Sequence, residues 1–303
     1  MPDLCARDIL TSPLRSGFMR IVAPLLFVLM LLGCEAADKS HSLTLMNQGV
    51  AQFNDNNYPK AVEKLQESVR KWPKNHKAYF MLGQIYQFKY LQPEKAQTNY
   101  AKASEIVPDN ASYIYFKGSC LLEMGKLDEA ELALQKAIGL EEKHSDAHYR
   151  LGMLQEKKAE FVKAAGSYGE SIRANPTKPF AYFNLGDLYY RNEKFEQARQ
   201  VFKNGTENNP EHAELHHGLG VAYLSLKRHK EALIEFEDSL KLKPSYPSAL
   251  YNLGMTYFAL GERTKAKANL ENFIRSAGGG DNAARIAAAE AKLLEIQEAE
   301  RKR

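Results

Sequence analysis

Two histidine pairs have the spacing of metal ligands on a helix. His144 and His148 are four residues apart, as are His212 and His216, and His217 follows directly. Residues four apart share one face of a helix, so either pair could offer two imidazole nitrogens to a zinc ion. Neither pair encloses a carboxylate in the arrangement of a zinc protease. Whether these rings bind metal or pack against neighbours therefore depends on the elements that carry them.

Other residue types that perform chemistry form no catalytic pattern. The sequence contains no glycine-rich phosphate loop and no nucleophile elbow. Its three cysteines, Cys5, Cys34 and Cys120, are too few and too scattered for a disulfide framework or a paired-cysteine metal cluster. The 41 Lys and Arg residues nearly balance the 37 Asp and Glu residues, and no segment concentrates the basic ones. We therefore expect no enzyme, no cofactor and no nucleic-acid partner.

The N-terminal segment is typical of an exported protein. Residues 21–32 form a 12-residue apolar run that follows Arg15 and Arg20. This run is shorter than the roughly 20 residues that span a bilayer, but it has the length of a signal-peptide core. Leu31-Leu32-Gly33-Cys34 then resembles the lipobox of bacterial lipoproteins, whose cysteine becomes the acylated first residue. The alternatives are a plain secretory signal followed by an unrelated cysteine, or a buried apolar helix.

The lipobox resemblance implies a lipid anchor on Cys34 and a signal peptide over residues 1–33. Met19 lies directly before a basic residue and the apolar run, so it is an alternative start site. Several acyl chains hold a protein almost irreversibly on a membrane without a spanning helix. By the same resemblance, Glu35 rather than aspartate after the cysteine favours the outer membrane. We expect residues 34–41 to form a short tether on the periplasmic side.

The rest of the chain repeats with a period of 34 residues. Glycine recurs at this spacing, with one spacing of 35, at Gly49, Gly83, Gly118, Gly152, Gly186, Gly220 and Gly254. Alanine follows each glycine by 12 or 13 residues, at Ala61, Ala96, Ala130, Ala164, Ala198, Ala232 and Ala266. Four residues later stands a large apolar or aromatic residue, at Leu65, Tyr100, Leu134, Tyr168, Phe202, Phe236 and Leu270. Since glycine makes up about 7% of average sequences, chance does not explain this register.

Further residues keep the same register. A leucine before the glycine and a tyrosine three residues after it occur together at Leu82/Tyr86, Leu185/Tyr189, Leu219/Tyr223 and Leu253/Tyr257. Proline closes five repeats, at Pro73, Pro108, Pro176, Pro210 and Pro244. Together these residues resemble the tetratricopeptide repeat (TPR) family over about residues 42–280. The family's repeats are helix-turn-helix hairpins that stack on one another into a solenoid.

The spacing by itself also predicts two helices in each repeat. The repeat glycine and alanine are too far apart for one helical face with a turn between them, which predicts helices near residues 76–89 and 94–107 in the second repeat. Residues 278–281 break the period, and residues 281–303 have the pattern of an alanine-rich helix with one apolar stripe. The expected fold class is all-α: a TPR solenoid of seven helix-turn-helix repeats over residues 42–280 with a C-terminal capping helix.

The resemblance implies a peptide-binding groove. In TPR proteins the residue three before the repeat glycine points into the concave groove, and the residues four and seven further on share its face. The expected groove residues are aromatic or methionine for the most part: Phe80, Tyr115, Tyr149, Met153, Phe183, Asp187, Tyr190, His217, Tyr251 and Met255. Such a surface suits apolar side chains of an extended or helical peptide. The alternative is that these rings only pack.

The register also accounts for the histidine pairs. His148 and His216 occupy the position that Tyr79 and Tyr182 take in other repeats, where a packing ring is expected. The other member of each pair falls in a turn between repeats. We therefore expect no metal ligand among these histidines.

The predicted function is that of a lipid-anchored TPR scaffold or adaptor that assembles cell-envelope complexes at the bacterial outer membrane. Its expected partners are other proteins, namely envelope assembly factors or cell-wall enzymes, together with the membrane itself. The sequence resembles two lipoprotein groups, the pilotins that assist secretin assembly in type IV pili and the adaptors of peptidoglycan hydrolases. A pilotin-like factor is the alternative, although seven repeats exceed the roughly six of pilotins. A metal-dependent sensor or enzyme is a further alternative.

Overall fold

The described part of the chain is entirely helical. The computed structural model describes residues 17–278, 280 and 282–301, with side chains from residue 35 onwards. Residues 1–16 of the predicted signal peptide lie outside this part, as do its remaining side chains and that of Cys34. The described residues form fifteen α-helices and no strand. None of the helices searched among these residues has the length and apolar character needed to cross a bilayer.

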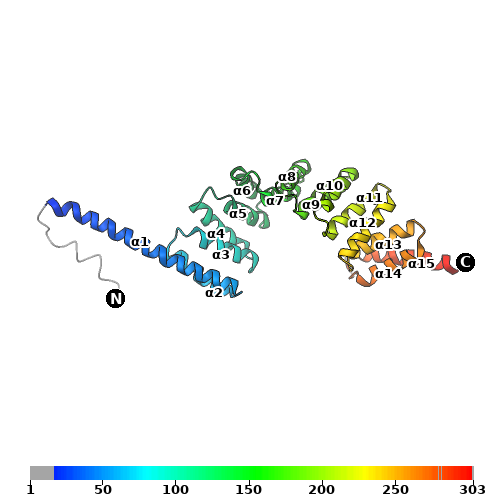
Figure 1. Ribbon diagram of the computed structural model, residues 1–303, viewed down its shortest axis with the longest axis horizontal. Coiled ribbons are helices and arrows are strands. Elements are labelled where there is room, and N and C mark those ends of the chain that lie inside the picture. Colours follow the sequence, from blue (N-terminus) through cyan, green and yellow to red (C-terminus); the bar gives the residue numbers. More distant parts are fainter. Residues whose placement is uncertain (1–16, 279, 281, 302–303) are drawn as a thin grey trace. The chain divides into compact units, whose positions relative to one another are not determined.

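The helices alternate between a first and a second helix of each repeat (Figure 1). The first helices are α1 (Gly17–Asn54), α3 (His76–Phe88), α5 (Ala111–Glu123), α7 (Ser145–Lys157), α9 (Pro179–Arg191), α11 (Ala213–Ser225) and α13 (Pro247–Ala259). The second helices are α2 (Tyr58–Lys71), α4 (Pro93–Ile106), α6 (Leu127–Leu140), α8 (Phe161–Ala174), α10 (Phe195–Asn208), α12 (His229–Leu242) and α14 (Arg263–Ser276). The last helix is α15 (Ala283–Arg301). The predicted all-α fold of seven hairpins with a closing helix is confirmed.

The chain divides into two compact units, residues 1–130 and 131–303, with the boundary inside α6. In the first unit, α1 packs on α2, α3 packs on α4, and α4 also contacts α5. In the second unit, α7 to α14 pack as consecutive hairpins, and α15 covers α13 and α14. The predicted stripe of α15 makes this contact, because Ala289 and Ile296 are fully buried. Each unit therefore buries the helix faces that the repeat pattern marks as apolar.

The first helix is much longer than the others. α1 runs without a break from Gly17 to Asn54, so it contains both the apolar run and the first helix of repeat one. The segment 34–41, expected as a short tether, is part of this helix. A helix rises about 1.5 Å per residue, whereas extended chain rises about 3.3 Å. Cys34 is therefore joined to the first repeat by a rigid element of short reach.

Close contact between first and second helices depends on the glycines. The ring of Phe202, which is 3% exposed, lies between α9 and α11. A Cβ added at Gly186 would stand 2.6 Å from Phe202 Cζ, and one added at Gly218 would stand 2.5 Å from Cε1. Real Cβ atoms do not approach so closely, so both positions exclude a side chain unless the ring moves. Gly218 is not one of the repeat glycines, and its contact with Phe202 arises only from stacking of successive hairpins.

The turn inside each hairpin uses one left-handed residue. A positive φ occurs once in every repeat, at Asn56, Leu91, Gly125, Ala159, Glu193, Lys227 and Gly261. In repeat five the next residue, Lys194, donates its N–H to the carbonyl of Tyr189 at 2.9 Å and so closes the end of α9. This is the usual left-handed helix termination, for which glycine is the residue without steric cost. Two of the seven positions are glycine and Asn56 also tolerates this conformation, so packing of the two helices imposes the turn at the other four.

Candidate functional site

All ten predicted groove residues lie on first helices. Phe80 and Tyr115 belong to α3 and α5 of the first unit, and the other eight belong to α7, α9, α11 and α13 of the second. Nine of the ten side chains are half-buried. Tyr115 differs, since it is only 9% exposed. We call these ten residues the row. Because the two units are separate bodies, the part of the row in each unit is described by itself.

In the first unit the row joins an aromatic cluster. The ring centroid of Phe80 lies 4.9 Å from that of Tyr113 and 5.2 Å from that of Phe116. Tyr115 lies 5.0 Å from the same Phe116 ring. Aromatic pairs at these distances contribute about 0.5–1.5 kcal/mol beyond their buried area. Phe80 and Tyr115 therefore pack in the core on one side, and the half-buried Phe80 offers the larger surface to a ligand.

In the second unit, hydrogen bonds link the rings of consecutive repeats. Asn184 donates its side-chain amide to the hydroxyl of Tyr149 at 3.2 Å. The amide nitrogen of Asn252 lies 3.0 Å from Nε2 of His217. Both pairs are 35 residues apart, one residue more than the repeat period. These contacts hold the polar edges of the rings in place, and both Tyr149 and His217 are half-buried.

A further bond of the same kind joins Ser225 and Tyr190, whose oxygens are 3.2 Å apart. The sequence interpretation included the rings but missed Asn184, Asn252 and Ser225. The sequence signal that could have found them is a spacing of 35 residues, one more than the repeat period. At this spacing, a residue contacts the position directly after its own equivalent in the next repeat. A side chain that can donate a hydrogen bond and lies 35 residues after a tyrosine or histidine of the row is therefore the pattern to look for.

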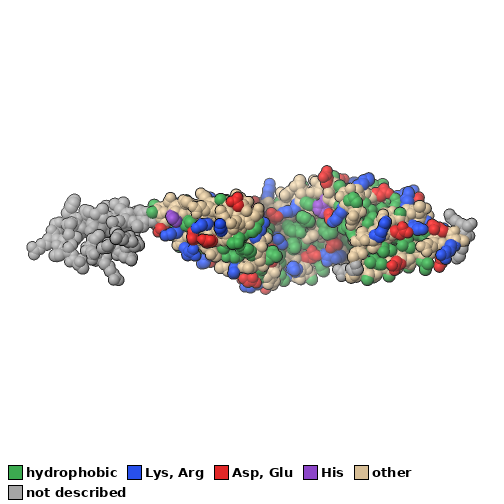
Figure 2. All heavy atoms as spheres, turned by 90° about the horizontal axis from the view of Figure 1, so that it is seen from below, with side chains coloured by type: hydrophobic (Ala, Val, Ile, Leu, Met, Phe, Trp, Pro, Cys, Tyr) green, Lys and Arg blue, Asp and Glu red, His purple; other side chains and the backbone are tan. Residues whose placement is uncertain are grey.

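The charges of this surface are balanced in ion pairs. The guanidinium of Arg191 donates from Nε to Asp187 at 2.7 Å, and it also pairs with Glu156 from the preceding repeat. Tyr168 donates its hydroxyl to Glu156 at 2.8 Å. Figure 2 shows Lys and Arg side chains interspersed with Asp and Glu on the face that it draws, with hydrophobic side chains between them. Asp187, the one carboxylate among the predicted groove residues, is therefore neutralised by its neighbour.

Burial keeps two side chains of the row, His217 and Tyr149, uncharged at pH 7. It lowers the pKa of His217 to about 4, so this imidazole is neutral at pH 7. Burial also raises the pKa of Tyr149 above its ordinary value. A neutral His217 accepts at Nε2 the hydrogen bond that the Asn252 amide can donate. Apart from Asp187, which is paired with Arg191, the row in the second unit therefore presents aromatic and methionine side chains.

Three of the four paired histidines have hydrogen-bonding partners outside their pair. His144 caps α7 by accepting from Ala147 N at 3.3 Å, and His148 Nε2 lies 2.8 Å from the carbonyl oxygen of Glu142. His216 lies 2.8 Å from Glu235 through Nδ1 and 3.0 Å from the carbonyl oxygen of Pro210 through Nε2. Asp238 is near enough to His216 and Glu235 to complete a three-ligand group. Both nitrogens of His216 nevertheless already have hydrogen-bonding partners.

The His216–Glu235 pair predicts a pH-dependent contribution to stability. The hydrogen bond that the Glu235 carboxylate accepts from Nδ1 raises the pKa of His216 above its ordinary value, despite the opposing effect of burial. The contribution is therefore fully present below the unfolded-state pKa and is lost as pH rises through the folded-state pKa. We expect Glu235→Gln to lower the free energy of unfolding by on the order of 1 kcal/mol at pH 6 and by less at pH 9. Denaturant titration at both pH values measures this.

Glu271→Gln is the matched control, because Glu271 is exposed and forms no ion pair among the described residues. Its effect should be small and the same at both pH values. If the free energy of unfolding that Glu235→Gln removes becomes larger as pH rises, His216 is not the proton-binding partner.

Comparisons with known proteins agree with the geometry. A tetratricopeptide repeat family model matches residues 46–86, 117–179 and 183–247, and a second model of the same description matches residues 248–277. No curated protein matches the sequence.

Solved structures with this fold are similar over most of the chain. The C-terminal part of a TPR repeat-containing protein from Cytophaga hutchinsonii has a TM-score of 0.65 at 18% identity, covering 82% of this chain and 99% of its own. PilF from Pseudomonas aeruginosa has a TM-score of 0.58 at 19% identity, and the match covers 70% of this chain and 96% of the PilF chain. Yeast Tom70 has a TM-score of 0.54 at 18% identity, and the match covers 87% of this chain and 56% of the Tom70 chain. At these identities the likeness shows the fold alone, but the family models match well over half of the sequence. The chain belongs to the tetratricopeptide repeat family.

Proposed function

We propose that this protein is a lipid-anchored TPR scaffold that binds segments of other proteins along its first helices. TPR folds are typically non-catalytic scaffolds, and TPR proteins bind other proteins or peptides. The observation that carries the proposal is the row of half-buried, neutral aromatic and methionine side chains on α7, α9, α11 and α13. Hydrogen bonds between repeats hold several of these rings, so little side-chain freedom is lost when a ligand binds.

The chemistry of this row favours a peptide with apolar side chains. Tyr149, Phe183 and Tyr251 each pack one side on the second helix of their own repeat, with ring centroids 5.9, 6.1 and 5.1 Å from Tyr168, Phe202 and Phe273. Aromatic rings of this kind stand in repeats four, five and seven, and His217 takes the same position in repeat six. An extended or amphipathic segment with regularly spaced apolar residues would bury the remaining surface of these rings.

The location that we propose is the periplasmic side of a bacterial outer membrane. One support is the lipobox resemblance at Cys34, which Glu35 directly follows in the sequence. The other is the short helical link from Cys34 to the first repeat. The proposed partners are envelope assembly factors or cell-wall enzymes, for which an anchored scaffold would supply a high local concentration.

A pilotin-like assembly factor for a type IV pilus secretin is the second candidate. The similarity of this chain to PilF over 96% of the PilF chain favours it, although at 19% identity that similarity concerns the fold. Co-purification with a secretin subunit would support this candidate, and co-purification with peptidoglycan hydrolases would support the adaptor.

The row is tested by replacing Tyr149 and Phe183 together with alanine. Both rings are half-buried, so the double variant should melt within a few degrees of wild type. A contact residue at the centre of an interface contributes about 2 kcal/mol or more, so capture of envelope partners should weaken at least about tenfold. The measurement is in vivo cross-linking with identification of the captured proteins, followed by affinity for the captured segment.

The control is Phe161→Ala with Val162→Ala, which removes apolar surface from the second helix α8 instead. These side chains are 42% and 86% exposed, so stability and binding should both stay near wild type. If the Tyr149/Phe183 variant retains its partners at wild-type strength, or melts far below wild type, the row serves packing and the proposed surface is wrong.

A further inference from the structure

The turn between α2 and α3 lies against the part of α1 that directly follows Cys34. Lys74 Nζ, in this turn, is 3.3 Å from Glu35 Oε1. Lys39 Nζ lies 5.2 Å from the ring centroid of Trp72, the C-cap residue of α2. Asn75 is 1% exposed and donates to the hydroxyl of Ser42 on α1 at 3.0 Å. The turn is therefore held to α1 by an ion pair, a cation–π contact and a buried hydrogen bond.

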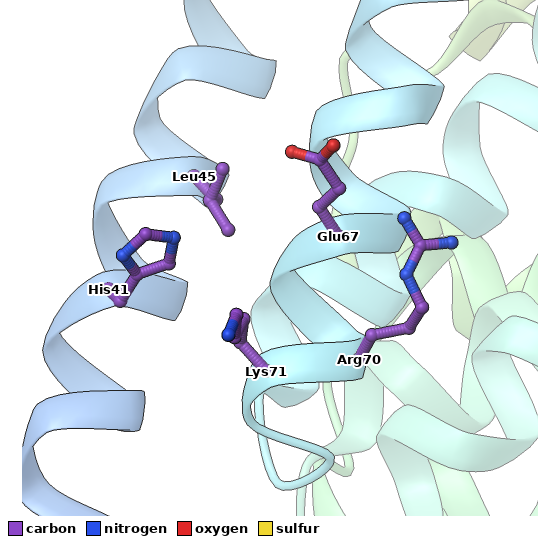
Figure 3. Close-up of a pocket in the computed structure, with 5 residues that line it drawn as sticks. All are labelled: His41, Leu45, Glu67, Arg70 and Lys71. Carbon is purple, nitrogen blue, oxygen red and sulfur yellow. The ribbon is translucent and has the colours of Figure 1, made fainter. Parts of the chain in front are cut away.

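A cleft with several basic side chains opens beside this turn. Figure 3 shows His41 and Leu45 on α1 facing Glu67 and Lys71 on α2, with Arg70 as a further lining residue. The cavity has a volume of ≈ 460 Å³.

The carboxylates near this cleft do not balance its cations. Glu67 is already paired with Lys64 at 2.9 Å, as Glu35 is with Lys74. Among the described residues Arg70 and Lys71 form no ion pair, and Asp38 is the remaining exposed carboxylate on this part of α1. The surface around the turn is therefore left with an excess of positive charge.

We propose that Lys39, Arg70, Lys71, Trp72 and Lys74, here called the basal face, lie on the membrane surface and bind the phosphate groups of anionic phospholipids. This inference rests on the proposed anchor at Cys34. His41 comes seven residues after Cys34 along the helix, a rise of about 10 Å, so acyl chains at Cys34 bring the turn to the headgroup region.

The side chains of the basal face suit that depth. Tryptophan prefers the membrane–water interface, where its ring is apolar and its N–H can be hydrated. Each Lys or Arg near an anionic bilayer strengthens the association about fivefold. Three of the four cations of the basal face, Lys39, Arg70 and Lys71, have no carboxylate within ion-pair distance among the described residues. The basal face would thus fix the orientation of the first unit relative to the bilayer plane. A flexible lipid anchor alone does not fix this orientation.

The single tryptophan of the chain makes the proposal directly measurable. The lipidated protein is reconstituted into vesicles of phosphatidylcholine alone and into vesicles that also contain phosphatidylglycerol, each with brominated acyl chains as a quencher. We expect the emission of Trp72 to shift to the blue and its quenching to increase about twofold in the anionic vesicles. Equal emission and quenching in the two vesicle types would overturn the inference.

A charge variant and a matched control identify the residues responsible. Lys39→Gln, Arg70→Gln and Lys71→Gln together should abolish the difference between the two vesicle types. The control removes the same charge at the other end of the first two hairpins, through Lys60→Gln, Lys89→Gln and Lys95→Gln, and should keep the difference. A difference that persists in the first variant would contradict the basal face.

The remaining outcomes separate this inference from the anchor on which it rests. Protein that does not float with either vesicle type would refute the anchor at Cys34 and the basal face with it. Protein that floats with both types but shows no dependence of Trp72 on phosphatidylglycerol would refute the basal face alone. If inorganic phosphate in solution reproduces the change in Trp72 emission without anionic lipid, the cleft binds free phosphate and the assignment to lipid is wrong.

Discussion

Replacing Phe236 with alanine is expected to lower the free energy of unfolding by about 3–5 kcal/mol. The side chain is fully buried. It lies so close to α11 that a Cβ added at Gly220 would stand 2.6 Å from its Cε1. The ring of His217 is also near, with centroids 5.8 Å apart. Loss of this ring would leave a cavity between α11 and α12 that the two helices cannot close without moving the repeats on either side.

Denaturant unfolding monitored by circular dichroism measures this loss. Ile234→Ala is the matched control, since Ile234 is on the same helix and is 57% exposed. Substitutions at such surface positions usually change stability by no more than about 0.5 kcal/mol. Similar losses for Phe236→Ala and Ile234→Ala would mean that the repeat register does not define the core of the second unit.

Replacing Cys34 with alanine is expected to abolish fatty-acid incorporation. The anchor proposed at this residue depends on a thiol, and alanine offers no nucleophile for acylation. Each buried CH₂ of an acyl chain contributes about 0.8 kcal/mol to membrane binding, so loss of several chains is an all-or-none change. Labelling cells with radioactive palmitate and measuring the label on the purified protein tests this directly.

Cys120→Ala provides the control for labelling at the other cysteine of the predicted mature chain. Cys120 is buried in the first unit, so it should take up no fatty acid and its replacement should leave the label in place. Label that stays on the Cys34→Ala variant, or its absence from the wild-type protein, would refute the lipid anchor.

Much of the fold could be predicted because each repeat carries the same physical constraints. The seven repeat alanines are all fully buried, as the close approach of the two helices requires. The large residue four positions later is at most 3% exposed in every repeat. The ten predicted groove residues lie on first helices, where residues three, four and seven apart share a helix face.

The partners of these side chains could not be predicted in the same way. Asn184 meets Tyr149, and Asn252 meets His217, through the relative shift of consecutive hairpins. A single repeat does not encode this shift. Tyr115 has the register of a groove residue, yet it is only 9% exposed, and its ring lies 5.0 Å from that of Phe116.

The amino-acid sequence by itself determined the number of hairpins, the helix faces that are buried and the apolar row on the first helices, because periodicity depends only on spacing. Tertiary structure decided the rest. It places Leu91 and Glu193 in the left-handed conformation, since the angle between two packed helices overrides the local preference of these residues. It presses Phe202 against Gly218 from the next repeat, and it brings Trp72 and Lys74 beside the part of α1 that follows Cys34. Those contacts join residues of different helices, whose distances are set by packing and not by position along the chain.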